Sequence, residues 1–238
     1  MSMLESEWNK KNKKEKQMRI NKLLSNYGIC SRKEARKLIE EGRIIVNGSK
    51  CIQGQWVEES DDILLDNEKL LPKKKVYIAF NKPVGVVCTA ASNVENNIID
   101  YIKYPEYIFP VGRLDKESEG LIILTNDGEM ANKILESENM HEKEYVVTVD
   151  KSYDEEFLNK MVEGVEILGV KTRPCKMERV NDDTFKITLT QGLNRQIRRM
   201  CKTLGYNVVI LKRIRILNLY LNNLEIGKWR YFDEKELY

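Results

Sequence analysis

The stretch with the clearest capacity for chemistry spans residues 112–120, where Arg113 and Asp115 stand two positions apart. All but one of its residues are glycine, serine or charged, which predicts a loop. Residues 121–125 are apolar and β-favouring and predict a buried strand, and the Asn-Asp-Gly of 126–128 predicts a turn. The loop therefore holds an acid and a base at the lip of a core strand, where functional groups commonly lie. A surface loop with ordinary ion pairs is the alternative interpretation.

A second group of charges lies toward the end of the chain. Between Phe185 and Leu224 there are eight basic residues and no acidic one, in a chain whose formal net charge is +3. Within this segment, residues 195–204 predict a helix whose buried stripe consists of Ile197, Met200, Cys201 and Leu204. The same periodicity places Arg198 beside the stripe and turns three basic side chains outward, namely Arg195, Arg199 and Lys202. Such a concentration of positive charge indicates a polyanionic partner.

Length and composition limit the class of protein. A chain of 238 residues can hold one medium domain and a small one, and its 42% hydrophobic and 32% charged content is typical of a globular protein with a polar surface. No apolar run approaches the roughly 20 residues of a membrane helix, and the charged N-terminus has no signal-peptide core. We therefore expect a cytoplasmic protein without a membrane partner.

The sequence gives no pattern for metal or cofactor binding. The five cysteines are widely spaced and His141 is the single histidine, so we expect no Cys/His metal site. We interpret the cysteines as small buried thiols in a reducing compartment. The chain has no dinucleotide-binding or P-loop glycine motif, and we expect no cofactor.

The first part of the chain predicts an arm, a small domain and a linker. Residues 1–17 are rich in lysine and predict a flexible basic arm. Residues 18–66 predict two short helices followed by short strands, and the second helix opens with a capping box of Ser31 and Glu34. Residues 67–75 include three successive lysines and show no periodicity, which predicts a linker.

Residues 76–238 predict a larger domain of strands and helices. We expect strands near 76–80, 121–125, 146–149, 175–180, 185–190, 208–216 and 219–224. Besides the basic helix, we expect helices near 97–104, 129–135 and 152–163. Ser152, with Glu155 three residues later, predicts the cap of the last of these, and Gly227 to Trp229 are expected to end the sheet.

Several motifs, taken together, match one known family. The central motif is Gly-Arg-Leu-Asp-Lys-Glu-Ser-Glu-Gly around Asp115, and the match continues without a gap to Gly128. Residues 18–66 contain Arg-Ile-Asn-Lys, Cys-Ser-Arg-Lys-Glu-Ala and Val-Asn-Gly. Further landmarks are Lys-Pro-x-Gly from Lys82, Lys-x-Tyr ending at Tyr145, and Asn-Arg-Gln-Ile-Arg-Arg-Met. The chain resembles the S4-domain ribosomal RNA pseudouridine synthases, most closely the F-type enzymes of the large ribosomal subunit.

The resemblance implies an α+β fold. A small α/β S4 RNA-binding domain would precede a catalytic domain with a mixed, mostly antiparallel sheet flanked by helices. It also implies an isomerase that cuts the N-glycosidic bond of a uridine and joins C5 of the rotated uracil to C1′ of the ribose. The substrate supplies every atom, so no cofactor is required. The implied substrates are 23S ribosomal RNA and the anticodon uridine of tyrosine tRNA, and we expect a monomer.

The family's residue roles pass to matching positions of this chain. By resemblance, Asp115 is the catalytic carboxylate, the second arginine of the last motif, Arg198, pairs with it, and Tyr145 stacks on the target base. Arg113 would fill the space that the extruded base leaves. The expected RNA contacts are Arg195, Arg199 and Lys202 of the basic helix and Arg19, Arg32, Arg36 and Arg43 of the S4-like domain.

This chemistry requires an ionised, desolvated carboxylate beside the ribose and the base. Burial alone would raise the pKa of Asp115, and a close guanidinium such as Arg198 is expected to lower it. Whether the carboxylate attacks the ribose, attacks the ring or removes a ribose proton stays open. One alternative function is a non-catalytic RNA-binding or ribosome-assembly protein on an inactive synthase scaffold. A hydrolase that uses Asp115 with water would lack the expected second carboxylate or metal.

Overall fold

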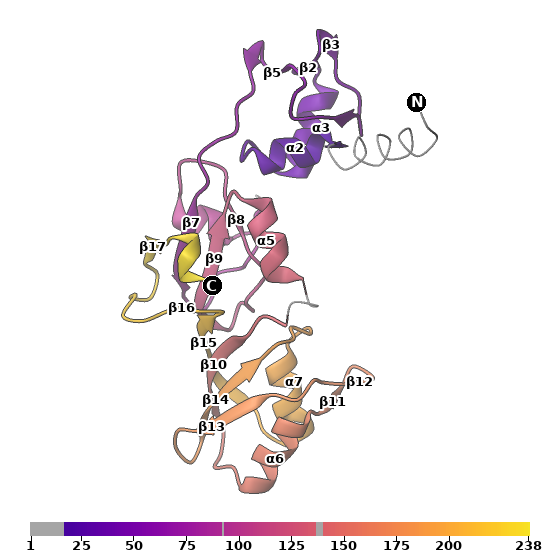
Figure 1. Cartoon of the computed structure of the whole chain (residues 1–238). Helices are drawn as coiled ribbons and strands as arrows, with labels where there is room; N and C mark the ends of the chain where they lie inside the picture. The colour runs from indigo at the N-terminus through magenta and orange to yellow at the C-terminus, as the bar shows by residue number, and fades with distance from the viewer. Residues whose placement is uncertain (1–16, 92, 137–139) are drawn as a thin grey trace. The chain divides into compact units, whose positions relative to one another are not determined.

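The computed structural model describes residues 17–91, 93–136 and 140–238, which form two compact units (Figure 1). Of the described residues, the smaller unit contains 17–75, 105–107 and 126–129, and the larger unit contains the others. The basic arm expected at residues 1–17 lies outside the described residues except for Gln17.

The smaller unit packs two helices against short strands. Its elements are β1 (Met18–Arg19), α2 (Ile20–Asn26), α3 (Arg32–Glu40), β2 (Ile44–Val46), β3 (Ser49–Lys50), β4 (Trp56–Val57), β5 (Ile63–Leu65) and β6 (Glu68–Lys69). Strands β3, β2, β5 and β6 form one sheet in that order, and β1 pairs with β4. The capping box is confirmed, because the Ser31 side chain accepts from the backbone of Glu34 and the Glu34 side chain accepts from that of Ser31.

The structure differs from the sequence in the segment expected to be a linker, 67–75. Glu68 and Lys69 form β6, which pairs with β5, and Leu70 is buried in the core of the smaller unit. Their strand is only two residues long. Such a strand is fixed by its partner, and hydrophobic periodicity cannot reveal it over so few residues.

The larger unit is built on a nine-stranded sheet in which β13, β14, β10, β15, β9, β7 and β17 follow one another, with β16 paired to β15 and β8 to β9. Its strands are β7 (Tyr77–Lys82), β8 (Phe109–Pro110), β9 (Glu119–Thr125), β10 (Lys143–Val149), β13 (Lys176–Arg179), β14 (Thr184–Leu189), β15 (Val208–Ile216), β16 (Leu219–Tyr220) and β17 (Trp229–Tyr231). Strands β9 and β15 run parallel, whereas the other pairings of the sheet are antiparallel. The mixed, mostly antiparallel sheet is therefore confirmed.

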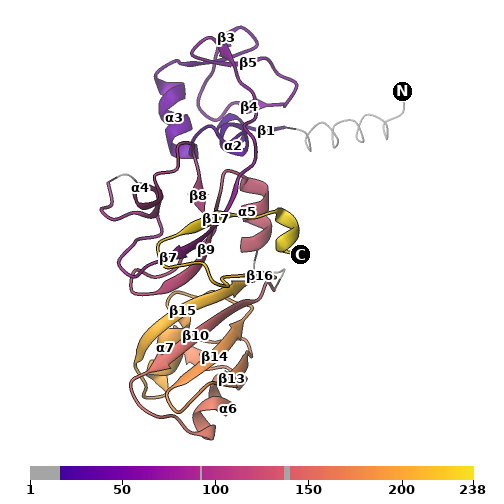
Figure 2. The same cartoon turned by 90° about the vertical axis from the view of Figure 1, so that its left-hand side faces the viewer.

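Helices cover the sheet on both faces. They are α4 (Ile98–Ile102), α5 (Gly128–Leu135), α6 (Glu155–Glu163), α7 (Gln196–Thr203) and the short 3-10 helix η2 (Glu234–Glu236), and β11 (Glu166–Ile167) pairs with β12 (Val170–Lys171). Figure 2 shows α4 and α5 on opposite sides of β7 and β9. Apolar residues of α6 and α7 share one core with β10, β14 and β15. This confirms the α+β class.

Two details of the larger unit differ from the sequence expectations. The cap of α6 is Asp154, whose side chain accepts from the backbone of Phe157, so the assignment to Ser152 is wrong. Both residues are good caps, and the helix begins late enough to use the second. The sheet also continues past Gly227, because β17 pairs antiparallel with β7.

The parallel pair β9–β15 positions the end of the central motif. Gly120 lies against the backbone of Arg213, and a Cβ atom at this glycine would come within 2.2 Å of the Arg213 carbonyl oxygen. Only glycine permits this approach. The motif's second glycine thus locks the loop that carries Asp115 onto β15.

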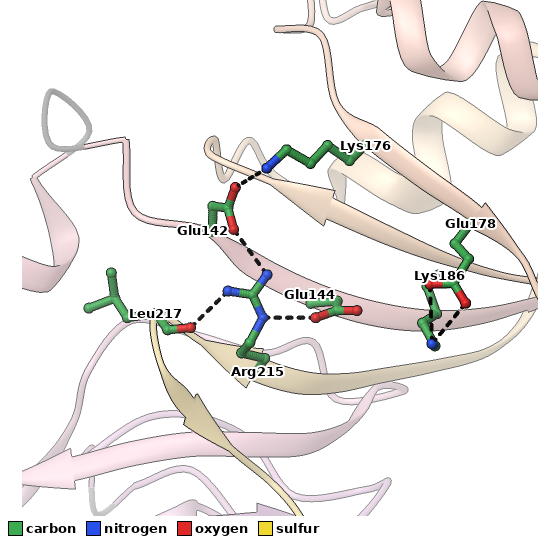
Figure 3. A network of polar contacts seen from close by, with 7 residues as sticks. All are labelled: Glu142, Glu144, Lys176, Glu178, Lys186, Arg215 and Leu217. Atoms are coloured by element: carbon green, nitrogen blue, oxygen red, sulfur yellow. Dashed lines mark hydrogen bonds and ion pairs between the residues drawn. The ribbon is translucent and has the colours of Figure 1, made fainter. Parts of the chain in front are cut away.

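One face of β10, β13, β14 and β15 carries a network of paired charges (Figure 3). Arg215 donates to Glu144 at 2.8 Å and to Glu142 at 3.0 Å, and Glu142 also accepts from Lys176 at 2.8 Å. Lys186 pairs with Glu178 nearby. We call this the back face. Two of the eight basic residues of 185–224, Lys186 and Arg215, are therefore paired with acids from other segments.

Candidate active site

The loop with Asp115 lies between β8 and β9 and is fixed at several points. The Leu114 and Ser118 side chains are buried on either side of Asp115, and the backbone N–H of Ser118 donates to the Asp115 carbonyl oxygen. The N–H of Gly85 donates to the carbonyl of Lys116 at 2.8 Å. Buried anchors and backbone hydrogen bonds give the carboxylate a defined position at the mouth of the core.

Arg198 reaches this loop from α7. Its Nη2 donates to the Glu117 carbonyl at 3.0 Å and to the Ser118 Oγ at 3.2 Å, and its Nη1 donates to the Val208 carbonyl at 3.1 Å. Its Nε lies 4.0 Å from Asp115 Oδ2, is buried, and has no hydrogen-bond partner in the part of the chain that the structure describes. Burial, and next the charge of Arg195, lower the pKa of the Arg198 guanidinium. This arginine holds the loop and lies within ion-pair distance of the carboxylate.

Arg195 also reaches the same carboxylate oxygen. Its Nη1 lies 4.0 Å from Asp115 Oδ2 and donates to Glu117 Oε2 at 2.7 Å. The reach depends on the backbone, because Arg195 precedes α7 in the left-handed conformation with φ of 51°. The sequence placed this side chain among outward RNA contacts, whereas the structure places it beside Asp115. Two guanidinium groups therefore flank one carboxylate.

Asp115 is only partly withdrawn from solvent, with 31% of its side chain exposed. The protein by itself therefore desolvates this carboxylate only in part, less than the sequence led us to expect. Asp115 lines a cavity of about 360 Å³, at the lower end of the range common for ligand sites, roughly 300–1,000 Å³. A bound nucleotide would remove much of the remaining solvent from the carboxylate.

Tyr145 lies in this cavity together with Asp115. It belongs to β10, lies opposite Arg213 of β15, and packs against two of the hydrophobic cores of the larger unit. A second, smaller cavity of about 110 Å³ is also lined by Tyr145 and Asp115. A half-buried aromatic ring beside a carboxylate gives the pocket a rigid apolar surface on which a planar base can stack.

Arg113 lines both cavities and is exposed. The alternative of a surface loop with ordinary ion pairs receives no support at Arg113, since Glu117 pairs with Arg195 and the described residues give Arg113 no ion pair. The side chain is therefore available at the rim of the pocket.

Two basic residues of the pocket were not assigned to the site from the sequence. Lys143 of β10 and Arg213 of β15 line the larger cavity with Tyr145. The signal was present as strand alternation, because Lys143 and Tyr145 are two residues apart and so share a face. Arg213 could not be placed in the same way, because the pairing of β10 with β15 contains a register shift.

The four arginines predicted to contact RNA in the smaller unit differ in their exposure to solvent and in whether another group of the protein already contacts them. Arg32 and Arg36 are exposed on α3, four residues apart, and share one face. Arg19 lies over the Trp56 ring, 4.4 Å from its centroid, and donates to the Gly54 carbonyl. Arg43 donates twice to Asp66, so its charge is locally compensated.

The remaining predicted contacts lie on α7. Lys202 is exposed, and Arg199 donates from Nε to the Asn194 carbonyl at 3.0 Å and from Nη2 to the Asn194 side chain. The buried stripe of α7 is confirmed at Ile197, Met200 and Cys201. These two cations therefore lie on the polar side of the helix, while Arg195 and Arg198 turn to the Asp115 loop.

All five cysteines are buried and unpaired, as expected of structural thiols. In residues 17–91, 93–136 and 140–238 there is no group of three or more His, Cys, Asp and Glu side chains suited to a metal ion. The same residues contain no helix with the length and apolar character needed to span a membrane. At Asp115 the described residues bring together a carboxylate, two flanking guanidinium groups and the aromatic ring of Tyr145.

Comparison with known proteins agrees with this geometry. The family model described as RNA pseudouridylate synthase matches residues 76–203, and that of the S4 domain matches residues 18–63. A crystal structure of a pseudouridylate synthase superposes with a TM-score of 0.68 at 29% identity, covering 92% of this chain and 98% of that one.

Curated relatives extend the match over most of the chain. The dual-specificity RNA pseudouridine synthase RluF of Escherichia coli (strain K12) is 47% identical over 223 residues, which cover 92% of this chain and 77% of the relative. The ribosomal large subunit pseudouridine synthase B of Bacillus subtilis (strain 168) is 35% identical, covering 92% of this chain and 93% of the relative. The resemblance inferred from the motifs is confirmed.

Proposed function

We propose, since the chain belongs to the RNA pseudouridylate synthase family, that this isomerase converts a specific uridine of 23S ribosomal RNA to pseudouridine. Its similarity to a large-subunit enzyme of Bacillus subtilis and to RluF supports this substrate class. The name of the RluF relative describes dual specificity, and we extend the proposal to a second substrate, the anticodon uridine of tyrosine tRNA.

The observation that carries the proposal is that Asp115 and Tyr145 line one cavity and that two arginines lie 4.0 Å from the Asp115 carboxylate. We assign to Asp115 the role of catalytic carboxylate, as nucleophile or general base. Arg198 and Arg195 flank it at 4.0 Å and fix its direction. Tyr145 receives the uracil, so that the glycosidic bond lies beside the carboxylate.

A uridine within structured RNA must leave its stack before it can reach this cavity. Extrusion of a base costs a few kcal/mol. We propose that Arg113, at the rim, occupies the space left in the RNA, and that phosphate contacts from Arg199 and Lys202 offset part of the cost. In the smaller unit, Arg32 and Arg36 are the contacts best supported by exposure, and Arg19 and Arg43 are weaker candidates because each already has a partner.

We propose a division of labour between an S4-like domain at 18–66, which selects the RNA, and a catalytic domain at 76–238, in a protein that acts as a monomer. Deletion of residues 1–66 tests this division. The truncated protein is expected to bind RNA more weakly and to choose sites less strictly, yet to modify a short fragment slowly. Unchanged selectivity would contradict the proposal.

The decisive test of function is to map pseudouridines in ribosomal RNA and tRNA from cells with and without this protein. We expect at least one position of 23S ribosomal RNA to lose pseudouridine and to regain it on expression of the wild type. If the pseudouridine map is the same with and without the protein, and the protein is found bound to ribosomal precursors, a non-catalytic assembly role is supported instead.

A further inference from the structure

The active-site cavity holds a buried arginine whose charge the proposed reaction has not used. Arg213 is only 3% exposed. Its Nε donates to the Leu121 carbonyl at 2.6 Å and its Nη1 donates to the Arg113 carbonyl at 3.5 Å, while its Nη2 is buried and has no hydrogen-bond partner among the described residues. An unmade hydrogen bond from a buried charged donor is unfavourable, and each such group in a native structure requires an explanation.

Lys143 lies on the same face of the sheet and is in a similar position. Burial, and next the positive charge of Arg213, lower the pKa of its ammonium group. Within the described parts of the chain its one polar contact is the His141 carbonyl, at 3.4 Å. Lys143 and Arg213 therefore repel each other, and among the described residues neither is paired with a carboxylate.

The charges that line the cavity do not balance. Among the described residues that line it, the cationic side chains are Arg113, Lys143, Arg195 and Arg213, and the carboxylates are Asp115 and Glu136. Asp115 is already flanked by Arg195 and Arg198 at 4.0 Å. The cavity therefore keeps an excess of positive charge on the side of Lys143 and Arg213.

We propose that Lys143 and Arg213 form a phosphate-binding subsite, which takes a backbone phosphate next to the flipped-out uridine. The inference rests on the proposed function, because the anion is part of the RNA. A uracil carbonyl could accept a hydrogen bond here, but it would leave the excess charge uncompensated. A phosphate supplies both the charge and several acceptor oxygens for an ammonium and a guanidinium group.

The spacing along the strand suits this assignment. Lys143 and Tyr145 are alternate residues of β10, roughly 7 Å apart along the same face. Arg213 lies directly opposite Tyr145 on β15. A base that stacks on Tyr145 would therefore have its own sugar-phosphate within reach of both cations, and the phosphate would fix how deeply the nucleotide enters.

The test removes the negative charge of one RNA phosphate and the positive charge of Lys143, separately and together. One synthetic hairpin carries a neutral methylphosphonate linkage on the 5′ side of the target uridine, another carries it on the 3′ side, and a third is unmodified. Wild type and Lys143→Met are compared with each RNA for dissociation constant and single-turnover rate. We expect one of the two linkages to weaken wild-type binding about tenfold or more, a size typical of a charged hydrogen bond.

Lys143→Met is expected to bind unmodified RNA more weakly by a similar factor and to be insensitive to that same linkage. The slope of log Kd against log salt concentration should fall by about one, which a purely structural role would not produce. Arg213→Lys provides a second variant that keeps the charge and should retain part of the sensitivity. Lys212→Met, on the same strand and opposite Val146, is the matched control and should behave as wild type.

The outcomes separate this subsite from the proposed function. If each methylphosphonate linkage weakens the binding of Lys143→Met as much as it weakens the binding of wild type, the two changes act independently. That result would overturn the subsite even if wild type forms pseudouridine. If one linkage weakens the binding of wild type but not of Lys143→Met, and wild type nevertheless forms no pseudouridine, the subsite is supported and the proposed activity is contradicted.

Discussion

The two faces of the strand pair β10–β15 differ in whether their arginine side chains are paired with carboxylates. On the back face, Arg215 donates to Glu142 and Glu144, and each of these carboxylates faces a basic group (Figure 3). On the pocket face, Arg213 has a buried Nη2 without a partner, although it stands only two residues before Arg215. The same strand therefore carries one compensated arginine and one uncompensated arginine.

A β-bulge creates this difference. Tyr145 pairs with Arg213 and Glu144 pairs with Arg215, so Ile214 is an extra residue between two consecutive pairs. Regular alternation would direct Arg213 and Arg215 to the same face, and the extra residue separates them. Charges that serve stability are paired on folding, whereas charges that meet a ligand stay uncompensated until it binds, as expected of functional sites.

The largest expected effect is on the pocket face, at Asp115. Asp115→Asn keeps the shape of the side chain and removes its charge, and we expect pseudouridine formation to fall by at least about 10³-fold while RNA affinity stays near wild type. Single-turnover assays and RNA binding measure the two quantities. Glu117→Gln is the control, since it neutralises the other carboxylate that contacts Arg195. Residual turnover within tenfold of wild type would refute the role of Asp115.

The next effect is expected at Arg198, which ties α7 to the Asp115 loop. Arg198→Ala should reduce turnover roughly 100-fold, typical of the loss of one preorganised electrostatic group, and should change RNA affinity much less. Arg198→Lys keeps the charge without the hydrogen bonds to Glu117 and Ser118, so partial recovery is expected. A collapse of affinity with unchanged turnover at saturation would make Arg198 a phosphate contact instead.

The sequence predicted most of the elements because their signals are local. The capping box at Ser31, the apolar strand after the Asp115 loop and the stripe of α7 each depend on neighbouring residues, and all are confirmed. The aromatic strand β17 was missed because its three residues gain their strand character from pairing with β7.

The site was predicted in part for the same reason. Motifs identified Asp115, Tyr145 and Arg198, and the structure brings the three around one carboxylate pocket. The approach of Arg195 depends on its left-handed backbone, and the approach of Arg213 depends on the bulge at Ile214. Neither conformation follows from residue type, since both are fixed by tertiary pairing.

On the back face, the expected effect is on stability. Arg215→Met removes the guanidinium that joins Glu142 and Glu144 and leaves two partly buried carboxylates close together. We expect the free energy of unfolding to fall by about 2 kcal/mol, since hydrogen bonds to charged groups are involved. Urea unfolding measures it, and activity per folded molecule should stay within twofold of wild type. A larger loss of activity than of stability would contradict the division between the faces.

The smallest expected effect is a pH-dependent one at Glu142. Hydrogen bonds from Lys176, and next from Arg215, lower the pKa of this carboxyl below its ordinary value. A lowered pKa means that the charged form stabilises the fold above the ordinary value of about 4.3, and that this contribution is lost as the pH falls through the folded-state pKa. At pH 7, Glu142→Gln should reduce the free energy of unfolding by about 0.5–1 kcal/mol, because the carboxylate is a third exposed and partly screened.

The difference between wild type and Glu142→Gln should then shrink as the pH is lowered below about 4.3 and vanish once wild-type Glu142 is protonated. Glu178→Gln is the control on the same face, and it should have a smaller effect because Glu178 is more exposed and pairs with Lys186 alone. Urea unfolding between pH 3 and about 7 covers the window that this linkage defines. If the difference in free energy of unfolding between wild type and Glu142→Gln stays constant across this range, Glu142 stabilises the sheet through packing. The ion pairs of the back face would then not be the source of its stability.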